Sequence, residues 1–160
     1  MKTAIVYYSM SGNTKLVAEQ MAAELNADLI PLIPKKAYPD SGFKKFFWGG
    51  KSAVMGDKPK LEPYAFDVYS YDLVILGSPV WAGTFAPPLR TFLHQHRDDL
   101  RGKRLATFFC CSGSPGKVLE KLRSCLNGVQ LEEEIILIDP KDKPSQENEE
   151  KIKGFIDALK

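Results

Sequence analysis

Short blocks of apolar residues alternate along this chain with stretches in which apolar residues recur every three or four positions. The blocks have the length of strands, and the recurring spacing is typical of helices with one apolar face. Strands and helices alternate in this way when a parallel sheet is covered by helices on both of its faces. The pattern therefore predicts an α/β protein with three layers.

Five repeats of a strand and a helix can be traced. The predicted strands cover residues 3–8, 29–33, 72–77, 104–110 and 131–138. The predicted helices cover residues 14–25, 41–54, 87–97, 116–126 and 146–159. The final helix shows the pattern most clearly, because four apolar residues fall on one face: Ile152, Phe155, Ile156 and Leu159.

Residues 34–67 interrupt the repeat, because they are rich in proline, glycine, aromatic residues and lysine. A segment of this length is too long for a simple connection. Two interpretations stay open for the helix expected at 41–54. It is either a solvated basic helix that packs through its phenylalanines, or it presents Trp48 and its lysines to a ligand or a partner.

The length of 160 residues predicts one domain that spans the whole chain, residues 1–160. A hydrophobic content of 44% and a charged content of 26% are ordinary for a soluble globular protein. No apolar run reaches the length of a membrane span, and the first residues lead into a strand without a signal-type region. We therefore expect a cytoplasmic protein that is a monomer or a weak homodimer and has no membrane partner.

Charge and cysteine usage exclude several classes of function. A formal net charge of +2 is too small to indicate nucleic-acid binding. Cys110 and Cys111 are adjacent, so a disulfide between them would close no useful loop, and we expect all three cysteines to serve in packing. His94 and His96 point to different sides of a helix, and no pair of cysteines has metal-binding spacing. We therefore expect no metal site.

The segment Ser9–Thr14 follows the first strand and leads directly into the first helix. Gly12 permits a tight turn, and the N-terminus of the helix carries the positive end of its dipole. The hydroxyl and amide donors of the segment are Ser9, Ser11, Asn13 and Thr14. This combination predicts a phosphate site built from uncharged donors. The alternative of a polar turn that only caps the helix stays open.

Other phosphate-binding folds leave different residues at this place. The segment lacks the second glycine and the lysine position of a Walker loop, and it contains no GxGxxG. A phosphatase loop would need a thiol and an arginine where the chain has Ser9 and Lys15, and a phospho-receiver would need acidic residues after the first and third strands. The sequence disfavours all four.

Two further loops are expected at the same edge of the sheet, where open parallel sheets bind ligands. The first covers residues 78–88 and contains Trp81 beside small residues, which suits a flat aromatic ring. The second covers residues 111–116, where glycine and serine leave backbone donors accessible. Together with the phosphate segment, these loops predict a cofactor site.

These residues carry a resemblance to the flavodoxin family along nearly the whole chain. The supporting motifs are Ser9-Met10-Ser11-Gly12-Asn13-Thr14, Gly77-Ser78-Pro79, Trp81-Ala82-Gly83 and the glycine-containing turn after the fourth strand. The resemblance implies a flavodoxin-like sandwich with a five-stranded parallel sheet in the order 2-1-3-4-5, and one bound FMN. The cofactor-binding residues that it implies are Ser9, Met10, Ser11, Gly12, Asn13, Thr14, Ser78, Pro79, Val80, Trp81, Ala82, Gly83, Thr84, Phe85, Cys111, Ser112, Gly113 and Gly116.

The resemblance also implies electron transfer through the isoalloxazine ring, without a catalytic acid or base. The carbonyl of the Ala82–Gly83 peptide is the expected acceptor for the reduced ring nitrogen N5. Carriers of this family are usually strongly acidic, whereas this chain is slightly basic and lysine-rich between residues 34 and 60.

Three functions therefore stay open. The first is an electron carrier that docks redox partner proteins. The second is an FMN-dependent NAD(P)H oxidoreductase that reduces a quinone or another small acceptor. The third is a flavin-free interaction module of the same fold, which the intact polar loop disfavours.

Overall fold

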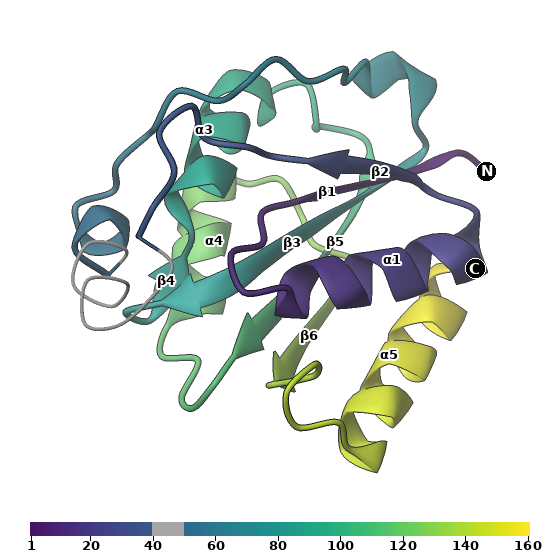
Figure 1. The fold of residues 1–160 in the computed structure, drawn as a ribbon. Coiled ribbons are helices and arrows are strands. Elements are labelled where there is room, and N and C mark those ends of the chain that lie inside the picture. Colours follow the sequence, from purple (N-terminus) through teal and green to yellow (C-terminus); the bar gives the residue numbers. More distant parts are fainter. Residues whose placement is uncertain (40–49) are drawn as a thin grey trace.

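The computed structural model describes residues 1–39 and 50–160 and shows a sheet between two layers of helices (Figure 1). The strands in the described residues are β1 (Thr3–Tyr7), β2 (Asp28–Pro31), β3 (Leu73–Trp81), β4 (Thr84–Phe85), β5 (Arg104–Cys111) and β6 (Glu133–Ile138). Five of them run parallel in the order β2-β1-β3-β5-β6, and β4 pairs antiparallel with the end of β3. Apart from the short β4, this is the predicted order 2-1-3-4-5, which is confirmed.

The helices form one layer on each face of the sheet. α1 (Asn13–Leu25) and α5 (Gln146–Leu159) pack on one face, and α3 (Pro87–His96) and α4 (Val118–Leu126) pack on the other (Figure 1). A 3-10 turn, Val68–Ser70, precedes β3. None of the described helices is long and apolar enough to cross a lipid bilayer.

The apolar run of β3 divides between the two faces of the sheet. Val74 and Leu76 belong to the core that contains α3 and α4, whereas Leu73 and Ile75 belong to the core that contains α1 and α5. All four side chains are fully buried. Successive side chains of a strand point to opposite faces, so a strand covered on both faces must be apolar at every position. This explains why the central strands read as uninterrupted apolar blocks.

β3 continues four residues beyond its predicted end at residue 77, so the prediction of a loop over residues 78–88 is wrong in its first part. Pro79 lies inside the strand, opposite Cys110 of β5. The carbonyl of Gly77 accepts a hydrogen bond from Tyr8 N–H, so Gly77 and Pro79 turn their backbones toward β1. β1 ends at Tyr7, and the missing N–H of proline therefore leaves no strand partner unpaired.

The predicted helix 41–54 is described only in its last residues, of which 50–54 are helical. The phenylalanines and Trp48 of that prediction lie outside the described residues. On either side of the undescribed part, Pro34 and Leu61 form an antiparallel bridge, and Lys35 N–H donates to the carbonyl of Lys60 at 2.9 Å.

Candidate functional site

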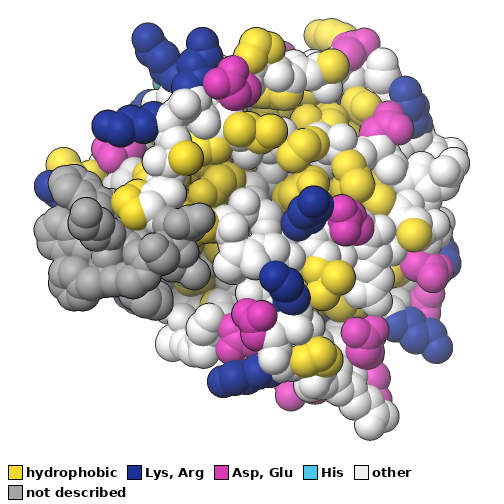
Figure 2. Space-filling model, in the orientation of Figure 1, with side chains coloured by type: hydrophobic (Ala, Val, Ile, Leu, Met, Phe, Trp, Pro, Cys, Tyr) yellow, Lys and Arg dark blue, Asp and Glu magenta, His cyan; other side chains and the backbone are white. Residues whose placement is uncertain are grey.

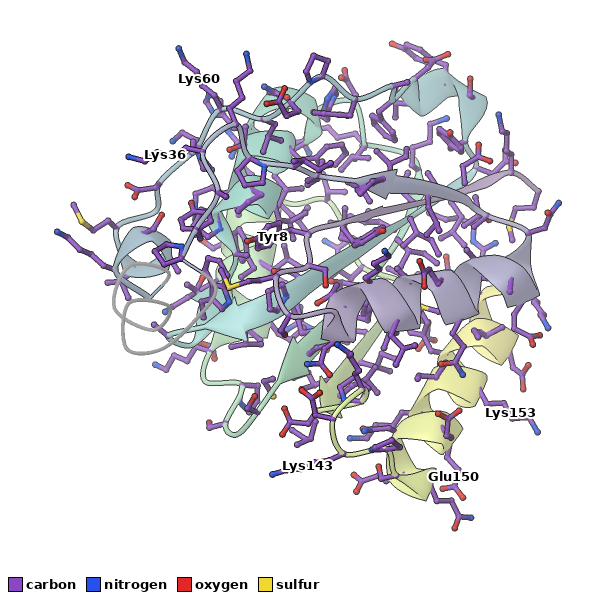
Figure 3. The ribbon with its side chains drawn as sticks, in the orientation of Figure 1. Tyr8, Lys36, Lys60, Lys143, Glu150 and Lys153 are labelled. Atoms are coloured by element: carbon purple, nitrogen blue, oxygen red, sulfur yellow. The ribbon has the colours of Figure 1, made fainter. Side chains whose placement is uncertain are left out.

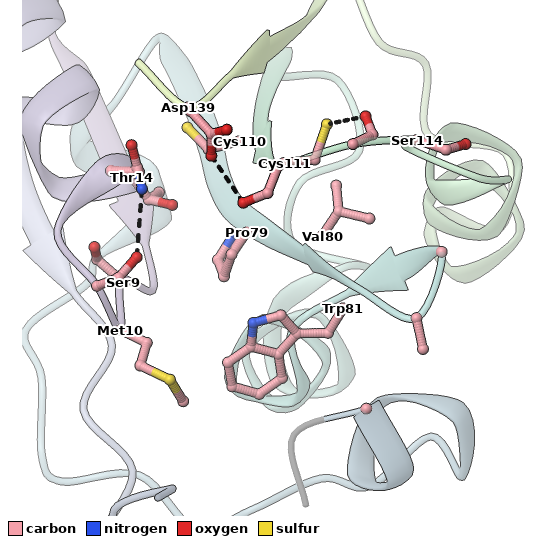
Figure 4. Close-up of a pocket in the computed structure, with 17 residues that line it drawn as sticks. Ser9, Met10, Thr14, Pro79, Val80, Trp81, Cys110, Cys111, Ser114 and Asp139 are labelled. Atoms are coloured by element: carbon pink, nitrogen blue, oxygen red, sulfur yellow. Dashed lines mark hydrogen bonds between the residues drawn. The ribbon is translucent and has the colours of Figure 1, made fainter. Parts of the chain in front are cut away.

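A cavity of about 360 Å³ opens at the carboxyl ends of β1, β3 and β5 (Figure 4). Its volume lies in the range of small-molecule sites, and its position is the one expected for a ligand of an open parallel sheet. The lining residues are Ser9, Met10, Ser11, Asn13, Thr14, Gly50, Pro79, Val80, Trp81, Ala82, Gly83, Cys110, Cys111, Ser112, Gly113, Ser114 and Asp139. The structure thus brings the three predicted loops together around one cavity.

Five of the predicted cofactor-binding residues do not line the cavity: Gly12, Ser78, Thr84, Phe85 and Gly116. The Ser78 side chain is buried, and its Oγ accepts a hydrogen bond from Ala86 N–H at 2.9 Å. Thr84 and Phe85 are buried in β4 behind Trp81. Gly12 and Gly116 adopt positive φ, and their lack of a side chain permits close contacts with Lys141 and Gly83, respectively. These five residues support the cavity wall.

The residues at the beginning of α1 form a cradle for an anion. Gly12 has a φ of 99°, a left-handed conformation that glycine adopts easily, and α1 begins at Asn13. Ser9 Oγ accepts a hydrogen bond from Lys15 N–H at 3.1 Å. Within the described residues, the N–H groups of Asn13 and Thr14 have no hydrogen-bond acceptor. Capping by Ser9 is therefore only partial, and the dipole end with its remaining donors faces the cavity.

The turn after β6 reaches the same cradle, which the sequence did not predict. Lys141 Nζ donates to the carbonyl of Ser11 at 3.1 Å, and Lys141 N–H donates to Asn13 Oδ1 at 2.9 Å. Asn13 Nδ2 lies 3.4 Å from Asp142 Oδ2. A lysine ammonium group is therefore bound to the predicted loop, in addition to the uncharged donors that the sequence predicts there.

The opposite end of the cavity is aromatic. Trp81 is half-buried at the end of β3, and the rings of Tyr8 and Tyr38 lie edge-on to it, with centroid distances of 5.5 and 5.2 Å. Figure 4 shows the indole across the cavity from Ser9, Met10 and Thr14. Burial raises the pKa of the Tyr8 phenol, so this side chain stays neutral. The edge-on tyrosines fix the orientation of the indole.

A two-residue turn joins β3 and β4 beside Trp81. Ala82 and Gly83 both have positive φ, 51° and 74°, as a tight hairpin turn requires. A Cβ on Gly116 would lie 2.7 Å from the Cα of Gly83, so this position admits only glycine without a shift of the backbone. The close approach joins the hairpin to the loop after β5 and closes the aromatic end of the cavity.

Two cysteines form the floor of the cavity. Burial raises the pKa of the Cys110 thiol to about 12, although a hydrogen bond with Thr14 opposes the shift. Cys111 Sγ lies 3.3 Å from the carbonyl of Gly113, and burial raises its pKa as well. Both groups are therefore thiols at neutral pH and poor nucleophiles. This agrees with their expected role in packing.

Asp139 brings a carboxylate to the cavity from the end of β6. It is only 7% exposed; its Oδ1 accepts from Ser112 Oγ at 2.8 Å and its Oδ2 lies 3.9 Å from Lys143 Nζ. Sequence reasoning missed this residue, together with Gly50 and Cys110, and it placed Ser114 in the predicted loop 111–116 without naming it as a cofactor-binding residue. Its position could have been predicted, because Asp139 directly follows the last parallel strand and the carboxyl ends of parallel strands meet at one edge of the sheet.

The two histidines lie outside the cavity. His94 is exposed, and His96 packs against Phe66 and Phe92 while its Nε2 lies 2.9 Å from the Tyr64 hydroxyl. In the described part of the chain, no three metal-ligating side chains come together. The described geometry therefore gives neither histidine a place in the site.

Comparison with known proteins agrees with this architecture. A model of the flavodoxin family matches residues 2–153. A flavoprotein of Lactobacillus acidophilus, solved in complex with FMN, is 29% identical and has a TM-score of 0.74 over 91% of this chain and 99% of that one. A search of curated proteins found no significant match.

Two more distant structures share the fold. A protein of Bacteroides eggerthii described as a flavoprotein is 23% identical, with a TM-score of 0.76 over 99% of this chain and 97% of that one. The two-electron reduced flavodoxin of Megasphaera elsdenii is 18% identical, with a TM-score of 0.63 over 99% of both chains. The family match spans almost every described element, from β1 into α5. The chain belongs to the flavodoxin family.

Proposed function

We propose that this chain is an FMN-binding electron-transfer protein of flavodoxin type. The observation that carries the proposal is one cavity with a phosphate cradle at one end and a tryptophan at the other. The family match and the relative solved with FMN support the same cofactor. An FMN-free interaction module has no need of such a cavity, so the geometry disfavours it.

The residues present fit FMN at both ends. The free N–H groups at the beginning of α1, together with Ser9, Ser11 and Asn13, would hold the phosphate. Trp81 would stack on the ring, and the peptides of Ala82–Gly83 and 111–114 would reach its polar edges. When it is bound, FMN supplies the redox chemistry. The protein would position the cofactor, shield it from water and place fixed charges beside it.

The cavity wall favours the oxidised cofactor over an anionic reduced form. The Asp139 carboxylate lines the cavity and is nearly buried, and the apolar indole of Trp81 lines the cavity with Tyr8 packed against it. Added negative charge is therefore poorly solvated and repelled by Asp139.

A second candidate function is an NAD(P)H oxidoreductase with a small acceptor. The observation that favours it is a group of exposed lysines held together by the bridge between residues 34 and 61: Lys35, Lys36, Lys58 and Lys60. Figure 3 labels Lys36 and Lys60 in the region where Figure 2 shows several basic side chains close together. Such a surface would attract the phosphates of a dinucleotide, and equally an acidic redox partner.

Potentiometric titration of the FMN-loaded protein separates the two candidates. A carrier should take up its electrons in two separate one-electron steps and should not oxidise NADPH without an added reductase. An oxidoreductase should oxidise NADPH steadily when a quinone is present. Each of the single variants Lys36→Glu and Lys60→Glu should slow that oxidation, whereas Lys153→Glu on α5 serves as a control of equal charge change. Single-step reduction together with NADPH oxidation would overturn the carrier assignment.

A further inference from the structure

The turn after β6 crosses the beginning of α1, which lies about 130 residues earlier in the sequence. Three contacts connect them. Lys141 binds the Ser11 carbonyl through Nζ and Asn13 Oδ1 through its backbone N–H, and Asn13 Nδ2 lies 3.4 Å from Asp142. Asp139 begins this turn with a φ of 42°, so the chain reverses sharply after the strand. The phosphate cradle is thus built from two segments rather than one.

The contact with Ser11 determines the direction of a peptide. In a trans peptide the C=O and N–H groups point in opposite directions. Because Lys141 Nζ holds the Ser11 carbonyl, the Gly12 N–H of the same peptide points away from the lysine. Gly12 also leaves room for the ammonium group, because a Cβ at this position would lie only 3.0 Å from Lys141 Nζ. The lysine therefore fixes the orientation of the Ser11–Gly12 peptide, which directly precedes α1.

The charge of Lys141 is available, unlike that of the neighbouring lysines. Lys15 pairs with Glu19 at 3.9 Å, and Lys143 pairs with Asp139 at the same distance. Within the residues that the structure describes, Lys141 forms no ion pair, and the partner of its ammonium group is a neutral carbonyl. A cation bound to a peptide increases the polarity of its N–H group and adds a positive field at the cradle.

We propose that Lys141 is the charged positioning residue of the FMN phosphate site. It fixes the Ser11–Gly12 peptide in the conformation that receives the phosphate and partly compensates the charge of the dianion. The inference rests on the proposed binding of FMN. It assigns to this chain a cationic contribution from the turn after β6, in addition to the helix dipole and the uncharged donors.

The test compares FMN with riboflavin, which lacks the phosphate, in titrations of the apoprotein. Lys141→Met should weaken FMN binding about five- to tenfold and leave riboflavin binding unchanged, because the charge acts only on the phosphate. Lys141→Arg should restore most of the FMN affinity. Lys153→Met, which removes the same charge from an exposed position on α5, should change neither affinity. Added salt should weaken FMN binding more in the wild type than in Lys141→Met.

The possible failures are distinguishable. If the wild type does not bind FMN, the proposed function is wrong. If the wild type binds FMN and Lys141→Met binds it equally well, or if FMN and riboflavin affinities fall together, the role of Lys141 is wrong while the proposed function stands. If Lys141→Met does not fold, the role of Lys141 is tested by the FMN affinity of Lys141→Arg and by the salt dependence of FMN binding to the wild type. An FMN affinity that responds to salt no more than the riboflavin affinity would then overturn the inference.

Discussion

The two ends of the cavity are built by different physical means. At the phosphate end, Ser9, Asn13 and Lys141 use directed hydrogen bonds and charge; Ser9 and Asn13 are half-buried and Lys141 is exposed. At the ring end, Trp81 is held by two tyrosine edges, and the turn at Gly83 presses against Gly116. The first end therefore recognises a charge, and the second recognises a flat shape. Changes at the phosphate end should affect FMN alone, whereas changes at the ring end should affect FMN and riboflavin equally.

The largest effect is expected at the contact of the two loops. Gly116→Val would place side-chain atoms against Gly83 and strain a residue with a φ of 55°. Overpacking and the left-handed conformation each cost about 1–3 kcal/mol. We expect binding of both FMN and riboflavin to weaken about 100-fold, as measured by the quenching of flavin fluorescence.

Gly154 provides the control for this substitution. It lies on α5 and does not line the cavity, no atom lies within 4 Å of the Cβ that alanine would add, and its φ is not positive. Gly154→Ala should therefore leave both affinities unchanged. A comparable loss in this variant would mean that the contact between Gly116 and Gly83 is not what limits binding.

Trp81→Ala should have the second largest effect. Removal of the indole takes away the stacking surface and the partner of Tyr8 and Tyr38, so both FMN and riboflavin should bind about 30-fold more weakly. The emission of bound flavin should increase, because tryptophan no longer quenches it. Tyr69→Ala is the control, since Tyr69 is an 84% exposed aromatic residue outside the cavity. An unchanged flavin spectrum in Trp81→Ala would place the ring elsewhere.

Ser9→Ala tests the phosphate end. The change leaves the Lys15 N–H without its acceptor and removes a hydroxyl from the cradle, which costs about 1 kcal/mol. FMN affinity should fall about fivefold and riboflavin affinity should stay the same. Ser145→Ala removes the corresponding cap of α5, where Ser145 Oγ accepts from Asn148 N–H at 3.1 Å. It should lower stability by a similar amount without any effect on FMN, and a loss of FMN there would show that stability alone controls binding.

Ala82→Gly should have the smallest effect. Alanine at a φ of 51° is strained by about 1 kcal/mol, and glycine relieves the strain at some cost in chain entropy. We expect the free energy of unfolding of the apoprotein to rise by about 0.5 kcal/mol in urea denaturation. Ala86 has a φ of −67° and is buried, so Ala86→Gly should instead destabilise the protein. If both variants behave alike, the turn at Ala82 is not strained.

The sequence predicted the parts of this structure that depend on local pattern. The strand order follows from apolar blocks and the family resemblance, and the segment Ser9–Thr14 is recognisable because its donors are contiguous. The extension of β3 through Pro79 was missed, because proline usually ends a strand and its tolerance here depends on where β1 ends. Lys141 was missed because its contacts join residues about 130 positions apart, which no local spacing reveals.

The central claim is that one cavity holds FMN with its phosphate at the beginning of α1 and its ring beside Trp81. Calorimetric titration of the apoprotein with FMN and with riboflavin tests this most directly. The account predicts one FMN per chain, bound at least about 100-fold more tightly than riboflavin, which corresponds to about 2.7 kcal/mol. Equal affinities for the two flavins, or no binding of either, would contradict it.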